Sequence, residues 1–144
     1  MAPRFRNGTH TEPPISVFVV DDVAELRELI RYGIEEDPAF EVVGEAGDGR
    51  SAIAGIAEAK PEAVLLDLSM PDMDGLEAIP KIRKADPDIA IIVLSGFSVD
   101  RMGKPARKRG ADGYIEKGTP IAELREATRK AVNERRSIAP ANNV

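Results

Sequence analysis

Five short strand-like runs alternate along this sequence with stretches whose apolar residues have helical spacing. The runs cover residues 15–20, 40–46, 63–68, 89–95 and 112–117. Nearly continuous apolar runs of this length are typical of strands buried on both faces, as in parallel sheets with helices on each side. The alternation therefore predicts an α/β domain built on one doubly wound parallel sheet.

Two of the intervening helices contain residues that disfavour a helix. Pro80 lies inside the third helix, where we expect a kink or a late start, because proline lacks the backbone donor and its ring clashes with the preceding turn. Gly103 and Pro105 lie inside the fourth helix, which is predicted to be short, mobile or both. The last helix is predicted to begin with Thr119 as N-cap and Pro120 as its first residue.

Composition and length limit the organisation of the chain. The 144 residues suit one domain. Residues 1–14 lack periodicity and are predicted to form a disordered N-terminal tail, with the folded domain over 15–136 and a C-terminal tail over 137–144. No apolar run approaches the roughly 20 residues that span a bilayer, so we expect no membrane contact.

Charge and cysteine content limit the partners and the compartment. The formal net charge of −5 argues against nucleic-acid binding by the domain itself. The sequence contains no cysteine, which excludes disulfides and thiolate metal sites and fits a cytoplasmic protein.

Charged or reactive side chains lie within or after four of the five predicted strands. They are Asp21, Asp22, Asp67, Ser95, Tyr114 and Lys117. Each has an ordinary explanation by itself: an aspartate before a helix is usually a cap, and a lysine is usually solvated. However, ligands of open parallel sheets bind beyond the carboxyl ends of the strands. We therefore expect these side chains to form one site.

Converging carboxylates restrict the chemistry of that site. Three of them close together repel one another and raise each other's pKa, which a hard divalent cation such as Mg²⁺ relieves. A carboxylate held there can attack phosphorus and form an acyl phosphate. The phosphoryl oxygens then need the metal, the Lys117 ammonium and the Ser95 hydroxyl as partners. The residues therefore favour magnesium-dependent phosphoryl transfer.

Four segments resemble, in order, the motifs of the response-regulator receiver family, the phosphoacceptor part of bacterial two-component signalling. They are VFVVDD, VLLDLSMPDMDG, IIVLSG and DGYIEKG. The resemblance covers about residues 15–135. The segment GEAGDG and the glycine after Lys117 are more similar to the NarL/FixJ class, and since most receivers have proline in place of Gly118, no cis-proline is expected. The resemblance implies a flavodoxin-like (βα)5 fold, with strand order 2-1-3-4-5 and helices on both faces.

The resemblance also implies a role for each residue of the set. Asp67 is the phosphoacceptor. Mg²⁺, or Mn²⁺, is held by Asp22 directly, by Asp21 through water, by Asp67 and by the backbone carbonyl of Ser69. Ser95 is the switch hydroxyl, Lys117 pairs with Asp67 or its phosphate, and Tyr114 is an aromatic side chain that swings inward when Ser95 moves.

The function implied by the resemblance is a signalling switch. A sensor histidine kinase or phosphotransfer protein phosphorylates Asp67. The surface of the fourth helix, fifth strand and fifth helix then controls an output partner or an output domain outside this sequence, with homodimer formation on phosphorylation as a further expectation. Such a switch is not an enzyme, although it catalyses its own phosphorylation and slow dephosphorylation. Five basic residues of the fourth helix form either a solvated surface or a docking face for an acidic partner: Arg101, Lys104, Arg107, Lys108 and Arg109.

Two other functions fit fewer of these residues. A magnesium-dependent phosphatase or phosphotransferase with an aspartyl nucleophile, of the haloacid-dehalogenase type, usually carries a second aspartate two residues after the first, where this sequence has Ser69. A flavodoxin-like cofactor binder would carry a glycine-rich loop after the first strand. Asp21 and Asp22 stand there instead and would repel a phosphate without a metal.

Overall fold

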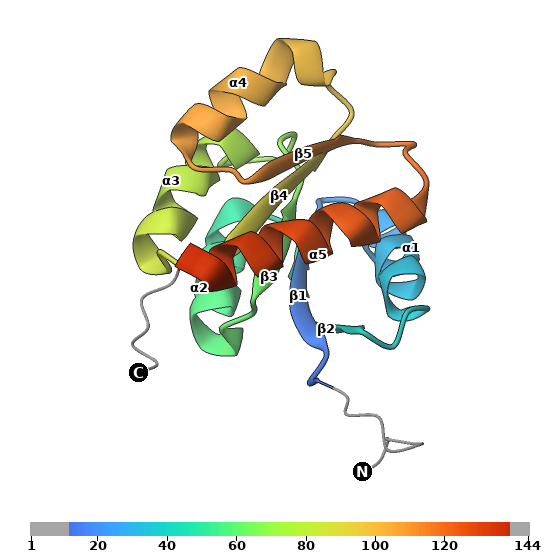
Figure 1. Cartoon of the computed structure of the whole chain (residues 1–144). Coiled ribbons are helices and arrows are strands. Elements are labelled where there is room, and N and C mark those ends of the chain that lie inside the picture. The colour runs from blue at the N-terminus through green and yellow to red at the C-terminus, as the bar shows by residue number, and fades with distance from the viewer. Residues whose placement is uncertain (1–11, 139–144) are drawn as a thin grey trace, which may run out of the picture.

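A parallel sheet between two layers of helices forms the fold of the computed structural model, which describes residues 12–138 (Figure 1). The strands are β1 (Ile15–Val20), β2 (Phe40–Ala46), β3 (Ala63–Leu66), β4 (Ala90–Ser95) and β5 (Gly113–Glu116). The helices are α1 (Ala24–Glu35), α2 (Gly49–Ala59), α3 (Gly75–Ala85), α4 (Val99–Arg109) and α5 (Ile121–Ile138). The sheet order is β2-β1-β3-β4-β5, so the predicted fold and strand order are confirmed. Most of each predicted tail lies outside the described residues.

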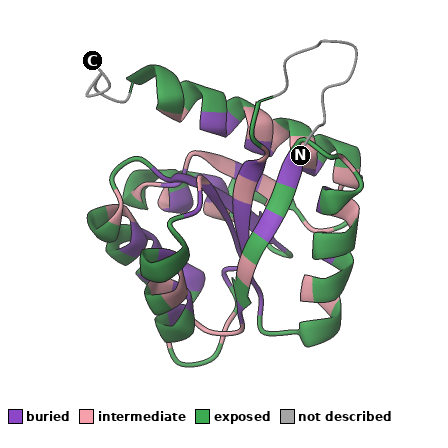
Figure 2. Cartoon of the chain, turned by 90° about the horizontal axis from the view of Figure 1, so that it is seen from below, coloured by how far each residue is buried: buried purple, intermediate pink, exposed green. Residues whose placement is uncertain are grey.

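Each face of the sheet has its own apolar core. Alternate side chains of β1 belong to different cores: Val17 and Val19 pack with α1 and α5, whereas Phe18 and Val20 pack with α2, α3 and α4. Figure 2 shows the buried residues concentrated in the strands and on the inner sides of the helices. The double covering explains why the strands read as continuous apolar runs. Among residues 12–138, no helix has the length and apolar character needed to cross a membrane.

The two helices with internal breakers are complete. α3 begins at Gly75, capped by the Asp74 carboxylate, which accepts a hydrogen bond from the Glu77 amide at 2.9 Å, so the predicted late start is wrong. α4 has 11 residues, as many as α3, so the prediction of a short helix is also wrong. Its buried residues Gly103 and Ala106 show the reason, because packing against the rest of the domain outweighs weak helix propensity.

The start of α5 differs from the prediction by one residue. The Thr119 amide donates to the Glu116 carbonyl at 3.2 Å, so Thr119 still belongs to the turn after β5. The Pro120 carbonyl accepts the first helical hydrogen bond, from the Leu124 amide at 3.3 Å. Pro120 is therefore the N-cap, and the predicted Thr119 cap is wrong. The helix continues to Ile138, past the predicted domain end at residue 136.

Candidate functional site

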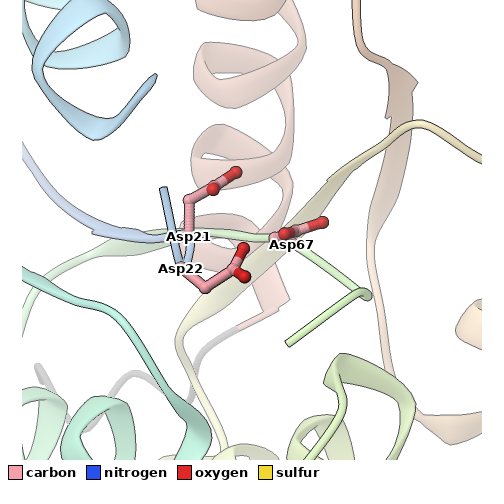
Figure 3. A group of neighbouring side chains, drawn as sticks. All are labelled: Asp21, Asp22 and Asp67. Atoms are coloured by element: carbon pink, nitrogen blue, oxygen red, sulfur yellow. The ribbon is translucent and has the colours of Figure 1, made fainter. Parts of the chain in front are cut away.

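The carboxyl ends of adjacent strands bring the aspartates together (Figure 3). β1 and β3 pair in parallel with Val20 opposite Leu66, so the residues that follow them, Asp21 and Asp67, lie at the same level. The Asp67 amide donates to the Val20 carbonyl at 3.0 Å, which extends the ladder by one bond beyond the strands. The register of the sheet therefore places a carboxylate at the end of a buried strand.

Three carboxylates form the centre of the site. Oxygen atoms of Asp21, Asp22 and Asp67 all lie within 4.8 Å of one another. The side chains of Asp21 and Asp67 are buried, and Asp22 is exposed. The N-cap of α1 is Val23, whose amide donates to Asp21 Oδ1 at 2.9 Å, so neither aspartate of the pair occupies the cap position. The ordinary explanation of the pair as a helix cap therefore fails.

Lys117 is the basic side chain paired with this cluster. Its Nζ lies 2.9 Å from Asp21 Oδ2 and 3.4 Å from Asp67 Oδ1. Gly118, which follows it, has a φ of 98°, a conformation that glycine adopts without strain. The described residues contain no cis peptide bond, as expected for a chain without proline at position 118.

Burial and charge shift the pKa values of the central pair. Burial raises the pKa of Asp67, and the charge of Asp21 adds to the rise, whereas the Ser69 amide and Lys117 oppose it. Burial by itself would lower the pKa of Lys117, but its hydrogen bond to Asp21 and the charges of both aspartates raise it instead. Lys117 therefore stays protonated at neutral pH, and its single positive charge pairs with two carboxyl groups of a cluster of three.

The donor set fits a hard divalent cation. Carboxylate oxygens in a partly buried cluster are what Mg²⁺ prefers, and a cation offsets the repulsion that one lysine leaves. The residues that could hold it are Asp21, Asp22, Asp67 and the Ser69 carbonyl. Ser69 is fixed near the cluster because its amide donates to Asp67 Oδ1 at 3.2 Å. Its role as a ligand stays a prediction.

Ser95 and Tyr114 are brought together through Phe97 of the β4–α4 loop. Ser95 is fully buried at the end of β4, and its Oγ accepts a hydrogen bond from the Phe97 amide at 3.1 Å. The Tyr114 hydroxyl donates to the Phe97 carbonyl at 2.7 Å. Tyr114 is buried in the core under α4, so its ring already lies inward. A swing of Tyr114 coupled to Ser95 stays a prediction.

Two residues that were not predicted from the sequence support the site. Arg27 Nη1 donates to the Asp21 carbonyl at 2.6 Å, and Arg27 Nε donates to the Glu45 carboxylate at 2.8 Å. Glu45 also accepts from Arg31 at 3.0 Å. Two features of the sequence could have indicated them. Glu45 lies near the end of β2, the one strand to which no site residue was assigned, and Arg27 lies in the helix that follows the aspartate pair.

Known proteins resemble this chain over most of its length. The family model of the response regulator receiver domain matches residues 17–129. The response regulator protein VraR of Staphylococcus saprophyticus is 38% identical over 124 residues, which cover 83% of this chain and 57% of VraR. The chain therefore spans a little over half the length of this curated relative.

Solved structures agree in fold and in class. A two-component response regulator of the LuxR family from Aurantimonas sp. has a TM-score of 0.81 at 32% identity, covering 85% of this chain and 87% of its own. The response regulator domain of Thermotoga maritima CheB has a TM-score of 0.79 at 32% identity, and the match covers 83% of this chain and 97% of the CheB domain. With the family model matching most of the described residues, this chain belongs to the response regulator receiver domains of two-component systems.

Proposed function

We propose that the chain is a phosphorylation switch in which Asp67 accepts a phosphoryl group from a sensor histidine kinase or a phosphotransfer protein. The observation that carries the proposal is the convergence of three carboxylates within 4.8 Å of one another beside Lys117. A site built only for stability would not gather three like charges around one lysine. Mg²⁺, or Mn²⁺, is the proposed cofactor, held by the oxygens of Asp21, Asp22, Asp67 and Ser69.

Each side chain has a part in the proposed transfer. An Asp67 carboxylate oxygen attacks the phosphorus of a phosphohistidine, the new O–P bond forms as the N–P bond breaks, and the imidazole leaves with the electron pair. The metal, when bound, supplies positive charge to the phosphoryl oxygens. The Lys117 ammonium and the Ser95 hydroxyl donate hydrogen bonds to the same oxygens. Slow attack by water on the phosphorus breaks the bond to Asp67, releases inorganic phosphate and returns the carboxylate, so the chain is a switch rather than an enzyme with an external substrate.

The output of the switch is proposed to pass through α4, β5 and α5. A phosphoryl group that binds Ser95 favours the arrangement in which that contact forms, and the population shifts accordingly. Ser95 is bonded to the residue that precedes the N-cap of α4, so the shift would reach α4 first.

The basic residues of α4 are the proposed docking surface for an acidic partner protein. Among residues 12–138, none of the three arginines of α4 lies within ion-pair distance of a carboxylate, whereas every arginine of α1, α3 and α5 does. Phe97 and Val99, at the start of the helix, are 39% and 44% exposed. Exposed apolar groups beside unpaired positive charge favour an acidic partner over a merely solvated face.

Homodimer formation on phosphorylation is proposed to use the groove between α1 and α5. This groove has a volume of about 420 Å³ and a mostly apolar lining. Leu29 and Tyr32 beside it are 67% and 73% exposed, which is unusual for large apolar side chains. The substitution Tyr32→Glu should then abolish any increase in molar mass on phosphorylation, as measured by light scattering.

The proposal is tested by incubating the protein with Mg²⁺ and acetyl phosphate and recording the intact mass. The expected result is one phosphoryl adduct on the wild-type chain and on Asp88→Ala, an exposed aspartate at the opposite edge of the sheet, and no adduct on Asp67→Ala. An adduct that persists in Asp67→Ala would reject the acceptor. A wild-type chain that binds Mg²⁺ but gains no phosphoryl group would reject the switch, and hydrolysis of phosphate esters would then be measured for the alternative enzyme.

A further inference from the structure

The first turn of α4 is capped by a side chain from strand β5. Ser98 is the N-cap of α4, but its own side chain makes no capping hydrogen bond. The Val99 amide, the first of the helix, donates instead to Glu116 Oε2 at 2.8 Å. A carboxylate at this position satisfies a donor that no helical carbonyl can reach, and its charge is favourable at a helix N-terminus.

The position of Glu116 follows from the β4–β5 register. Ser95 and Glu116 are paired residues of the two strands, so the residue that caps α4 is the β5 neighbour of the proposed switch residue. Phe97, two residues after Ser95, is bonded on both sides: its amide donates to Ser95 Oγ at 3.1 Å, and its carbonyl accepts from the Tyr114 hydroxyl at 2.7 Å. Three side chains from two adjacent strands therefore hold the segment from Phe97 to Val99.

We propose that Glu116 is a positioning residue that restrains the switch by holding α4 and its loop in the unphosphorylated arrangement. The inference rests on the proposed phosphorylation of Asp67. In the present arrangement the Ser95 hydroxyl oxygen is engaged by the Phe97 amide. The shift of Ser95 toward a phosphoryl group on Asp67 that is proposed above would also displace the loop, because the Phe97 amide is bonded to Ser95 Oγ. Hydrogen bonds made only in one arrangement stabilise that arrangement, so the Glu116 cap opposes the move.

Four variants separate the parts of this inference. Glu116→Ala removes the acceptor and the charge, and Glu116→Gln keeps an oxygen acceptor without the charge. Ser98→Ala is the matched control, because the Ser98 side chain makes no cap bond. Glu58→Ala, an exposed carboxylate of α2, controls for the change in net charge.

The first measurement is amide hydrogen exchange of residues 97–102 in the unphosphorylated protein. We expect exchange in Glu116→Ala to be faster than in wild type by roughly fivefold, the size of effect typical for loss of a helix cap, with an intermediate increase in Glu116→Gln. Exchange should be unchanged in Ser98→Ala and Glu58→Ala. Unchanged exchange in Glu116→Ala would overturn the cap itself, and this result does not depend on phosphorylation.

The second measurement is the initial rate of phosphorylation by acetyl phosphate with Mg²⁺. Glu116→Ala is expected to react faster than wild type by about the same factor of five, because less restraint opposes the active arrangement. Faster exchange without faster phosphorylation, or slower phosphorylation, would overturn the restraining role and leave only a structural cap. A wild-type chain that does not react would contradict the proposed function instead, while the exchange result on the cap would still stand.

Discussion

The two edges of the sheet hold charged clusters of opposite composition. At the carboxyl edge, three aspartates lie together, and the Lys117 ammonium pairs with two of them, Asp21 and Asp67. At the amino edge, the single carboxylate of Asp112 accepts from Arg83 at 2.9 Å, from Arg135 at 3.0 and 2.7 Å, and from the Ile91 amide at 2.8 Å. One cluster has excess negative charge, and the other has more than enough donors for its carboxylate.

The difference separates a structural cluster from a functional one. Arg83 also donates to the Ile89 and Gly110 carbonyls at 2.6 and 2.8 Å, so the amino-edge cluster ties α3 and α5 to the segments that lead into β4 and β5. A network satisfied in this way contributes stability and needs no ligand. Excess like charge at the carboxyl edge lowers stability, and its presence is explained by binding and reaction there.

The largest expected effect is at the amino edge. The substitution Asp112→Ala leaves Arg83, Arg135 and the Ile91 amide without their acceptor, so the free energy of unfolding should fall by about 3 kcal/mol. Urea unfolding followed by circular dichroism measures the change. Asp88→Ala removes an exposed carboxylate near the same edge and should change stability by less than about 0.5 kcal/mol. A similar small loss in Asp112→Ala would show that the network is not structural.

An intermediate effect on stability is expected from removing the lysine side chain at the carboxyl edge. Lys117→Ala leaves the buried carboxylates of Asp21 and Asp67 unpaired and should lower the free energy of unfolding by about 2 kcal/mol without a metal. Mg²⁺ should restore more stability to this variant than to the wild-type chain, because the metal then supplies the missing charge. Lys81→Ala, an exposed lysine on α3, is the control. Equal Mg²⁺ effects in all three proteins would contradict a metal site at the cluster.

The convergence of the site residues could be predicted from the sequence, because parallel strands end at one edge and each run of apolar residues marks where its strand ends. Asp21, Asp67 and Lys117 follow three such runs, and the structure brings them into contact. This part of the prediction needed only the order of the elements.

Contacts that depend on side-chain direction could not be predicted in the same way. Arg27 reaches the Asp21 carbonyl only because of how α1 lies on the sheet, and Glu116 caps α4 only because its residue pairs with Ser95 across the strands. The full length of α4 was missed for a related reason, since propensity at Gly103 does not report its packing. The local sequence therefore predicts where strands end better than it predicts tertiary contacts between side chains.

The smallest effect is the one that compares the two edges most directly. Asp67→Asn should raise the free energy of unfolding by roughly 1 kcal/mol at pH 7, whereas Asp112→Asn should lower it, because only the carboxyl edge has surplus negative charge. Burial raises the pKa of Asp67 above its ordinary value of 3.8, so the ionised side chain favours the unfolded state above that pH.

The gain from Asp67→Asn should therefore depend on pH with a defined sign. As the pH falls through the raised pKa of Asp67, the folded wild-type chain binds a proton, and the difference in free energy of unfolding between it and Asp67→Asn becomes smaller. Below pH 3.8 the carboxyl group is protonated in both states, and the two proteins should be equally stable. Thermal unfolding between pH 3 and 8 without metal measures the difference. A gain that stays constant across this range would show that Asn stabilises by packing, and that repulsion among the carboxylates does not set the stability of this edge.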